Sequence, residues 1–474
     1  MASFLSRLIT SGINVYIISV LTHTLRGPGY GEYVLVFVYL AAFAALADLG
    51  LYAYLVRYIS QVDDDQERAT GAVLGLDITA NIVFLIIACG IALLTHYPPV
   101  VKIGFVLGTV FVISTSLIQI ATAVYQKHVR MADFAIIDVL FRFIHLVLVL
   151  GIAQQNFGML WFVGILSIVE FFHAVIVIGW MKRFAPFSLR FKISEWVPVL
   201  KESYPMAISL VLVFLYFKFD SLILSFLRPP EDVAVYSLAY KIIEAVIFIP
   251  AIYIGMVMPQ LSRAFRDSVA SARTYSLMAW DVIWLIAIPC SFGIAYYAPE
   301  IISLFAPEEF AGAVPALRIL SVAMIAIFLG NLGGNGLIAA HKQKTALLIY
   351  ACAAILSILL NLILIPKLGY IGTSITTVVV ELFVSGALFV VLSRCLNSYF
   401  SLRMLRIPLA SSMSMAILLG CSWYLSLNLW FGILFCALLY IPLVLVLRGT
   451  TLRELRSALN FNNENDLIQG SASS

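Results

Sequence analysis

The chain has 474 residues, of which 62% are hydrophobic and only 11% are Asp, Glu, Lys or Arg. A soluble globular protein has roughly a quarter of its residues charged, so this composition excludes an ordinary soluble domain. The net charge of +4 is small, and we expect no nucleic-acid partner. Apolar runs of about 20 residues predict membrane-spanning helices, because the strands of a membrane barrel alternate over about ten residues. The expected fold class is therefore an all-α polytopic membrane protein.

Fourteen transmembrane helices are expected, joined by loops too short to hold a soluble domain. The opening residues read as a first span rather than as a cleavable signal peptide. Six cysteines are scattered in or beside apolar runs without paired or metal-like spacing, so we expect no metal site and no cofactor. The expected spans are 4–25, 31–56, 70–95, 102–126, 131–153, 157–181, 203–227, 233–262, 274–298, 312–340, 345–366, 369–393, 404–425 and 428–447.

The Lys and Arg residues of the expected loops predict the orientation of the chain. Twenty-one of them lie on one side of the membrane and four on the other, which are Arg26, Lys102, Arg228 and Lys367. Short cytoplasmic loops carry an excess of positive charge. We therefore expect both termini in the cytoplasm and the protein in the cell (inner) membrane as a multi-pass protein.

Two halves of the chain look like copies in parallel orientation. The spacing from Gly158 to Glu170 in the sixth span is the same as that from Gly369 to Glu381 in the twelfth. Parallel repeats are expected when an even number of spans is duplicated. The predicted organisation is an N-terminal bundle over 1–181, a basic cytoplasmic linker over 182–202, a C-terminal bundle over 203–393, peripheral spans over 394–447 and a cytoplasmic tail over 448–474.

Several ionisable residues fall inside these apolar runs. The seventh and eighth spans contain Lys218, Asp220, Lys241 and Glu244, and the fifth contains Arg142 near mid-membrane. With a helical rise of about 1.5 Å per residue, Asp220 and Lys241 lie at similar depth on adjacent helices, which allows an ion pair. Such groups cost at least a few kcal/mol in hydrocarbon and normally face a bundle interior or a watery cavity. These positions therefore predict a polar pathway.

Two interpretations of these charges stay open. Internal ion pairs that hold helices in register explain Asp138–Arg142 and Lys241–Glu244 as well as function does, and the structural interpretation is favoured for the acidic residues near helix ends, which are Asp48, Asp77 and Asp281. Mid-depth cations favour function, because Arg and Lys bind diphosphate groups. The candidate substrate-binding residues are Arg142, Lys218, Lys241 and Arg318. The candidate ion-coupling residues, which would bind H⁺ or Na⁺, are Asp220, Glu244, Glu170 and Glu381.

Short signatures spread over almost the whole chain carry a family resemblance. They are Gly31-Glu32-Tyr33, Asp48-Leu49-Gly50-Leu51, Tyr204-Pro205, Val235-Tyr236, Leu317-Arg318-Ile319-Leu320, His341-Lys342-Gln343-Lys344 and Asn361-Leu362-Ile363-Leu364-Ile365-Pro366. In their order and spacing the sequence resembles the Wzx-type oligosaccharide flippases, the polysaccharide-transporter branch of the multidrug/oligosaccharidyl-lipid/polysaccharide (MOP) exporter superfamily. The resemblance implies two six-helix bundles across a central cavity, with two C-terminal helices outside.

The implied activity is ion-gradient-driven movement of an undecaprenyl-diphosphate-linked oligosaccharide, for O-antigen, capsule or exopolysaccharide, across the cytoplasmic membrane. The implied partners are this lipid-linked substrate, H⁺ or Na⁺, the lipid bilayer, and a glycan polymerase with its chain-length machinery.

Two alternatives remain from the sequence. A multidrug or small-molecule exporter of the same superfamily would have a less cationic cavity. A membrane glycan polymerase or ligase would carry a sizeable catalytic outer loop, whereas the longest outer loop here, 298–312, offers Glu300, Glu308 and Glu309 without a base–nucleophile set. We therefore expect no catalytic residues and no enzyme activity.

Overall fold

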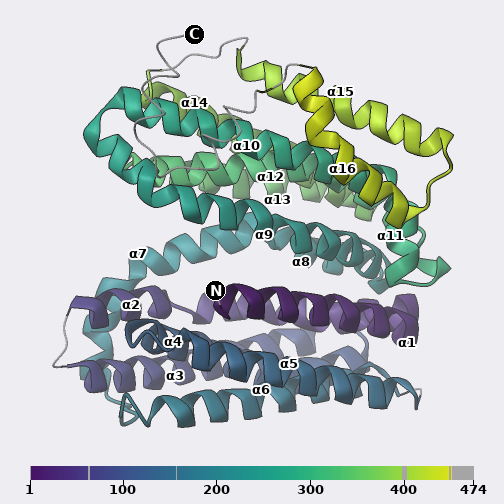
Figure 1. Cartoon of the computed structure of the whole chain (residues 1–474). Coiled ribbons are helices and arrows are strands. Elements are labelled where there is room, and N and C mark those ends of the chain that lie inside the picture. Colours follow the sequence, from purple (N-terminus) through teal and green to yellow (C-terminus); the bar gives the residue numbers. More distant parts are fainter. Residues whose placement is uncertain (1, 62–64, 156, 398–402, 448–449, 451–474) are drawn as a thin grey trace. The chain divides into compact units, whose positions relative to one another are not determined.

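The computed structural model describes residues 2–61, 65–155, 157–397, 403–447 and 450, and every regular element in these ranges is helical (Figure 1). The elements of the N-terminal half are α1 (Ala2–Ala47), α2 (Leu51–Gln61), α3 (Gln66–Leu94), α4 (Pro99–Lys127), α5 (Met131–Ala153), α6 (Met159–Met181), α7 (Ile193–Phe217) and α8 (Phe219–Leu227). Those that follow are α9 (Pro230–Asp267), α10 (Val269–Tyr296), α11 (Ala298–Phe305), the 3₁₀ turn η1 (Glu308–Phe310), α12 (Ala313–Ala339), α13 (Gln343–Leu368), α14 (Tyr370–Cys395), α15 (Arg403–Tyr424) and α16 (Leu429–Val446). The all-α prediction is confirmed.

Helix α1 contains the first two expected spans. Its 46 residues would reach about 69 Å as one straight helix, roughly twice the hydrocarbon thickness of a bilayer. Arg26 interrupts it with non-helical backbone angles (φ 60°, ψ −176°), and Pro28 follows two residues later. Thirteen helices of the described residues are long and apolar enough to cross a membrane. Counting α1 as two at this kink yields the fourteen expected spans.

The seventh span is broken rather than continuous. Helix α7 ends at Phe217 and α8 begins at Phe219, with Lys218 between them at φ −130° and ψ −11°. Helix α7 also begins at Ile193, well before the expected start at residue 203 and inside the segment predicted as a linker. That first part mixes charged and apolar residues and rests on α2, where Arg57 donates to Glu202 at 2.9 Å. Glu195, Lys201 and Glu202 lower the hydropathy of this stretch, which explains the shifted boundary.

The described chain divides into two compact units. The first unit contains residues 1–237 and 305–310, and the second unit contains 238–304 and 311–474, so the division falls inside α9. The core of the first unit lies between α1, α3, α4 and α6, with a further cluster where α2 joins α3 and α4. In the second unit, α12 packs on α10, α13 and α14, and α15 and α16 pack on α10. Apart from Thr450, the expected tail at 448–474 lies outside the described residues.

Small residues allow the closest helix contacts in each unit. A methyl group on Gly108 of α4 would lie 2.5 Å from Leu40 of α1, and one on Gly104 would lie 2.7 Å from Val36. In the second unit, Gly333 and Gly336 of α12 face α14 at comparably short distances. Membrane helices associate through such close approaches, since lipid supplies no hydrophobic force between them. These contacts fix α4 against α1 and α12 against α14.

Helix boundaries follow the spacing of the expected repeat. The interval along the chain from Met159, where α6 begins, to Tyr370, where α14 begins, is the same as that from Glu170 to Glu381. Helix α5 begins at Met131 and α13 at Gln343, so these two starts are one residue further apart along the chain than those of α6 and α14. Each glutamate is thus the twelfth residue of its helix.

Candidate substrate and ion-coupling site

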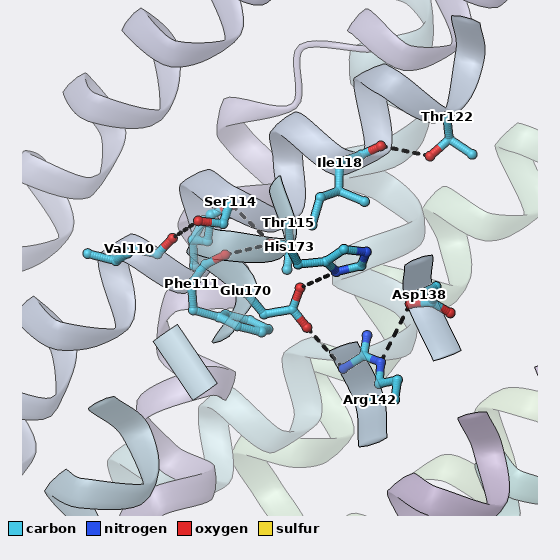
Figure 2. A network of polar contacts seen from close by, with 11 residues as sticks. Val110, Phe111, Ser114, Thr115, Ile118, Thr122, Asp138, Arg142, Glu170 and His173 are labelled. Carbon is cyan, nitrogen blue, oxygen red and sulfur yellow. Dashed lines mark hydrogen bonds and ion pairs between the residues drawn. The ribbon is translucent and has the colours of Figure 1, made fainter. Parts of the chain in front are cut away.

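A chain of four charged or titratable side chains joins α5 to α6 (Figure 2). Arg142 Nη1 lies 3.0 Å from Glu170 Oε1, and Arg142 Nε lies 3.7 Å from Asp138 Oδ1. His173 Nδ1 lies 3.1 Å from Glu170 Oε2. Helical spacing produces this arrangement, because Asp138 and Arg142 are four residues apart and Glu170 and His173 three apart, so each pair shares a face. We call these four residues the α5–α6 network.

The α5–α6 network runs from a partly open end to a buried end. The side chains of Arg142 and Asp138 are 27% and 24% exposed, whereas those of Glu170 and His173 are 3% and 2% exposed. Arg142 therefore neutralises a buried carboxylate from a position that other molecules can reach. The Ser114 hydroxyl of the adjacent α4 is satisfied within its own helix, because it donates to the Val110 carbonyl at 2.7 Å (Figure 2).

The ring of His173 has a defined role in this chain of contacts. A carboxylate only accepts hydrogen bonds, so Nδ1 carries a proton and donates it to Glu170. The ring stacks on Phe141 at 5.0 Å between centroids and on Phe134 at 6.4 Å. Asp138, Arg142 and Glu170 together carry a formal charge of −1. Such a cluster favours binding one further positive charge.

Asp220 belongs to a different network in the first unit. It is the second residue of α8 and its side chain is buried. The Tyr236 hydroxyl of α9 donates to Asp220 Oδ2, and the Ser221 amide donates to Oδ1 at 2.6 Å. Lys218 adjoins it at the break between α7 and α8. The structure thus supplies Asp220 with hydrogen-bond donors from α8 and α9.

Lys241 and Glu244 form the ion pair allowed by their spacing. Lys241 Nζ lies 2.7 Å from Glu244 Oε2, and the two side chains are 49% and 28% exposed. Both residues lie on α9 in the second unit. An ammonium group half exposed this far along a spanning helix needs water or another polar group around it.

Arg318 and Glu381 complete the predicted residues in the second unit. Arg318 is exposed on α12 and donates from Nε to the Ala295 carbonyl of α10 at 3.2 Å. Glu381 is buried on α14, within electrostatic reach of Tyr350 on α13. Within the units, the structure brings Arg142 into direct contact with Glu170 and Lys241 into direct contact with Glu244.

The sequence interpretation undervalued two residues. The sequence named Tyr236 only as part of the Val235-Tyr236 signature, but its hydroxyl binds Asp220. Asp77 was placed near an aqueous helix end, yet its side chain is only 1% exposed. The sequence signal for a buried polar group was Asn81, which lies four residues later on the same helix face. Its side chain donates to Asp77 Oδ1 at 3.1 Å.

Comparison with known proteins agrees with the helical arrangement. A family model described as polysaccharide biosynthesis protein matches residues 20–315, more than half of the chain. An uncharacterised membrane protein of Methanocaldococcus jannaschii is 28% identical over 130 residues, which is 27% of this chain and 26% of that protein. The alignment thus spans about a quarter of that relative's length.

Solved structures share the fold at low sequence identity. The lipid II flippase MurJ, in an inward closed conformation, is 13% identical with a TM-score of 0.78, covering 97% of this chain and 99% of that one. An inward-facing multidrug resistance transporter of the MATE family is 14% identical with a TM-score of 0.63, covering 83% and 98%. A MOP superfamily transporter from Pyrococcus furiosus is 16% identical with a TM-score of 0.58, covering 84% and 93%. This chain has the fold of the MOP transporters and belongs to the family of polysaccharide biosynthesis proteins.

Proposed function

We propose that the protein is a flippase that moves an undecaprenyl-diphosphate-linked oligosaccharide across the cytoplasmic membrane during polysaccharide biosynthesis. The observation that carries this proposal is the α5–α6 network, which holds a partly exposed guanidinium group inside spanning helices of a polysaccharide biosynthesis protein. A carbohydrate without acidic groups has no charge for such a group to bind, whereas a diphosphate does. The O-antigen, capsule and exopolysaccharide precursors all share this lipid diphosphate.

The geometry of Arg142 suits a diphosphate. Its contacts with Asp138 and Glu170 use Nε and Nη1, and a guanidinium has five N–H donors in a planar fork. The remaining donors are available to a phosphate oxygen, and Arg binds phosphate in a bidentate manner. We propose that Lys218, Lys241 and Arg318 provide further positive charge along the path of the diphosphate.

Competition between Glu170 and the substrate for Arg142 provides a way to couple transport to an ion. When the carboxylate is ionised, it holds the guanidinium at 3.0 Å. Binding of H⁺ or Na⁺ at this carboxylate would weaken the ion pair and release Arg142 toward the phosphate. Asp220, Glu244 and Glu381 are proposed to respond to the same ion gradient in the other networks.

The proposed orientation has both termini in the cytoplasm. Basic residues of the first unit gather where α2, α3 and α7 begin or end, as in the ion pair of Arg68 with Glu195 at 3.3 Å. The kink of α1, by contrast, has the ion pair of Arg26 with Glu309 at 3.3 Å. The positive-inside rule assigns the more basic end to the cytoplasm.

Removal of the protein from its host provides the direct genetic test. Loss of the gene should abolish one surface glycan and cause its lipid-linked precursor to accumulate in the cytoplasmic leaflet. Arg142→Ala should fail to restore the glycan although the variant inserts at wild-type levels. Arg142→Lys is the matched control, which keeps the charge but loses the bidentate fork, and should restore glycan partly.

The same experiment separates this function from the export of small molecules. Normal glycan in the deletion strain, together with increased sensitivity to toxic organic cations, would contradict the flippase proposal and favour an exporter. Complete rescue by Arg142→Ala would contradict a role of Arg142 in substrate binding.

A further inference from the structure

A second acidic pair lies in the first unit, apart from the α5–α6 network. Asp77 is the twelfth residue of α3 and is 1% exposed, and Asp48 is half-buried at the junction of α1 and α2. Ser116 Oγ of α4 donates to Asp77 Oδ1 at 2.6 Å, and Asn81 Nδ2 donates to the same oxygen at 3.1 Å. The other carboxyl oxygen, Asp77 Oδ2, is buried and has no hydrogen-bond partner among the described residues.

One face of α4 connects the two carboxyl groups. Ser116 and Gln119 are three residues apart on this helix, so they lie on the same face. Gln119 Nε2 donates to Asp48 Oδ2 at 3.3 Å, while Ser116 binds Asp77. The backbone amide of Gly50 donates to Asp48 Oδ1 at 3.1 Å. A row of polar side chains therefore leads from the half-buried Asp48 to the fully buried Asp77.

Three arginines on neighbouring elements form salt bridges with other carboxylates. In the described part of the chain, Asp48 and Asp77 form hydrogen bonds but no salt bridge. Arginines of α2, α3 and the segment before α7 are paired with carboxylates of α7. They are Arg57 with Glu202 at 2.9 Å, Arg68 with Glu195 at 3.3 Å and Arg190 with Glu195 at 3.1 Å. No histidine is hydrogen-bonded to either aspartate in the described residues.

An ionised Asp77 in these surroundings would be a buried charge without a counter-ion. A carboxylate in that situation takes up a proton or binds a cation. Hard metal cations need several oxygen ligands, but Asn81 directs its amide nitrogen, rather than its oxygen, at the carboxyl group. Asp48 adds a second acidic group, joined to the same face of α4 through Gln119.

We propose that Asp77 is a proton-binding carboxyl group inside the first unit, with the proton on Oδ2, and that Ser116, Gln119 and Asp48 mark the path between it and the aqueous edge. In its neutral form, Asp77 keeps both donors on Oδ1 and the buried Oδ2 no longer carries charge. The site needs no metal, no cofactor and no part of the second unit.

Infrared spectroscopy of the full-length protein in lipid nanodiscs tests this assignment directly. A protonated carboxyl group has a C=O band distinct from that of a carboxylate. Asp77→Asn should remove one such band from the spectrum at neutral pH. Asp133→Asn is the matched control, because Asp133 is 37% exposed at the start of α5 and its variant should leave the band intact.

The pH at which half of this band is lost is the midpoint of the titration of Asp77. Two further variants should move this midpoint in opposite directions. Ser116→Ala removes a donor that stabilises the ionised form, so the midpoint should rise by about one pH unit. Asp48→Asn removes a neighbouring negative charge, so the midpoint should fall. These two variants keep the inference testable if Asp77→Asn does not fold.

Three results would overturn the inference. The first is persistence of the band in Asp77→Asn, and the second is a midpoint that neither neighbouring variant changes. The third is a midpoint that moves when NaCl is replaced by choline chloride, which would assign the site to Na⁺ instead of a proton.

Discussion

The helix pairs α5–α6 and α13–α14 share their spacing but differ in their charges. Glu170 and Glu381 occupy the same position of each pair. By position within their helices, Arg142 of α5 corresponds to Ala354 of α13 and His173 of α6 to Val384 of α14, so both are replaced by apolar residues, whereas Asp138 corresponds to Tyr350. Helices α13 and α14 instead carry buried neutral polar groups, such as Asn361 and Thr376.

The two helix pairs therefore have the same helix spacing but not the same charged residues. Both pairs place a glutamate on the twelfth residue of the second helix, although the residues at the other corresponding positions differ. Among these corresponding positions, an arginine opposite that glutamate occurs in the first pair alone. We infer that Arg142 and its partners on α5 and α6 serve substrate or ion binding.

Removal of the central cation should have the largest effect. Arg142→Ala leaves Glu170, which is 3% exposed, without its counter-ion. Breaking a buried pair from one side costs about 3–5 kcal/mol, and the partial exposure of Arg142 favours the lower end. Thermal unfolding of the purified variant should show this loss. The double variant Arg142→Ala with Glu170→Gln should recover part of it, and equal stability of the single variant and wild type would contradict a buried ion pair.

The two glutamates should respond differently to the same substitution. Glu170→Gln removes the charge that binds Arg142 and accepts from His173, with an expected loss of about 2 kcal/mol. Glu381→Gln, without an arginine at the corresponding position, should cost less. Unfolding curves of both variants measure the difference. Equal losses would mean that the charges around Glu170 do not distinguish the two pairs.

The glycines that precede the second helix of each pair provide a backbone test. Gly369 has φ 57° and ψ −136°, a conformation that side chains disfavour, whereas its counterpart Gly158 has φ −71° and open space where an added methyl group would lie. Gly369→Ala should therefore cost about 1–2 kcal/mol, and Gly158→Ala should be nearly neutral. The comparison of unfolding midpoints checks the ranking. Its reversal would contradict the backbone difference between the pairs.

The stability of the first unit should depend slightly on pH through His128, at a position where the second unit has no titratable group. Desolvation of the ring, followed by the charges of Lys127 and Arg130, lowers the pKa of His128, whose counterpart is Ala339. The unfolded chain then binds the proton more tightly than the folded protein does, so stability should fall as the pH drops below about 6.5. His128→Gln should remove this contribution in thermal unfolding at several pH values. An unchanged pH profile would contradict it.

Much of the fold was predictable because each span must satisfy its backbone within hydrocarbon. The turn at Leu25-Arg26-Gly27-Pro28 was expected between two spans, and Arg26 breaks α1 there. The break at Lys218 was not expected, since no Gly or Pro marks it and apolar residues continue on both sides. Its backbone conformation depends on how α7 and α8 pack in three dimensions.

The candidate site was predictable only in part. Helical spacing placed Asp138 with Arg142 and Glu170 with His173, but the contact between Arg142 and Glu170 joins two helices whose rotation no single sequence specifies. Likewise, the burial of Asp77 depends on α4, because its partner Ser116 lies on that separate helix. Local periodicity predicts which residues share a face, and packing decides which faces meet.

Transport by the purified protein in liposomes tests the central proposal most directly. A polyprenyl-diphosphate-linked oligosaccharide placed in one leaflet should become accessible in the other leaflet when wild-type protein and an ion gradient are present. Arg142→Ala protein that has folded and inserted should slow this movement at least tenfold, which is about 1.4 kcal/mol of lost interaction. Equal rates for this variant and wild type, or movement of the substrate in protein-free liposomes at the same rate, would contradict the account.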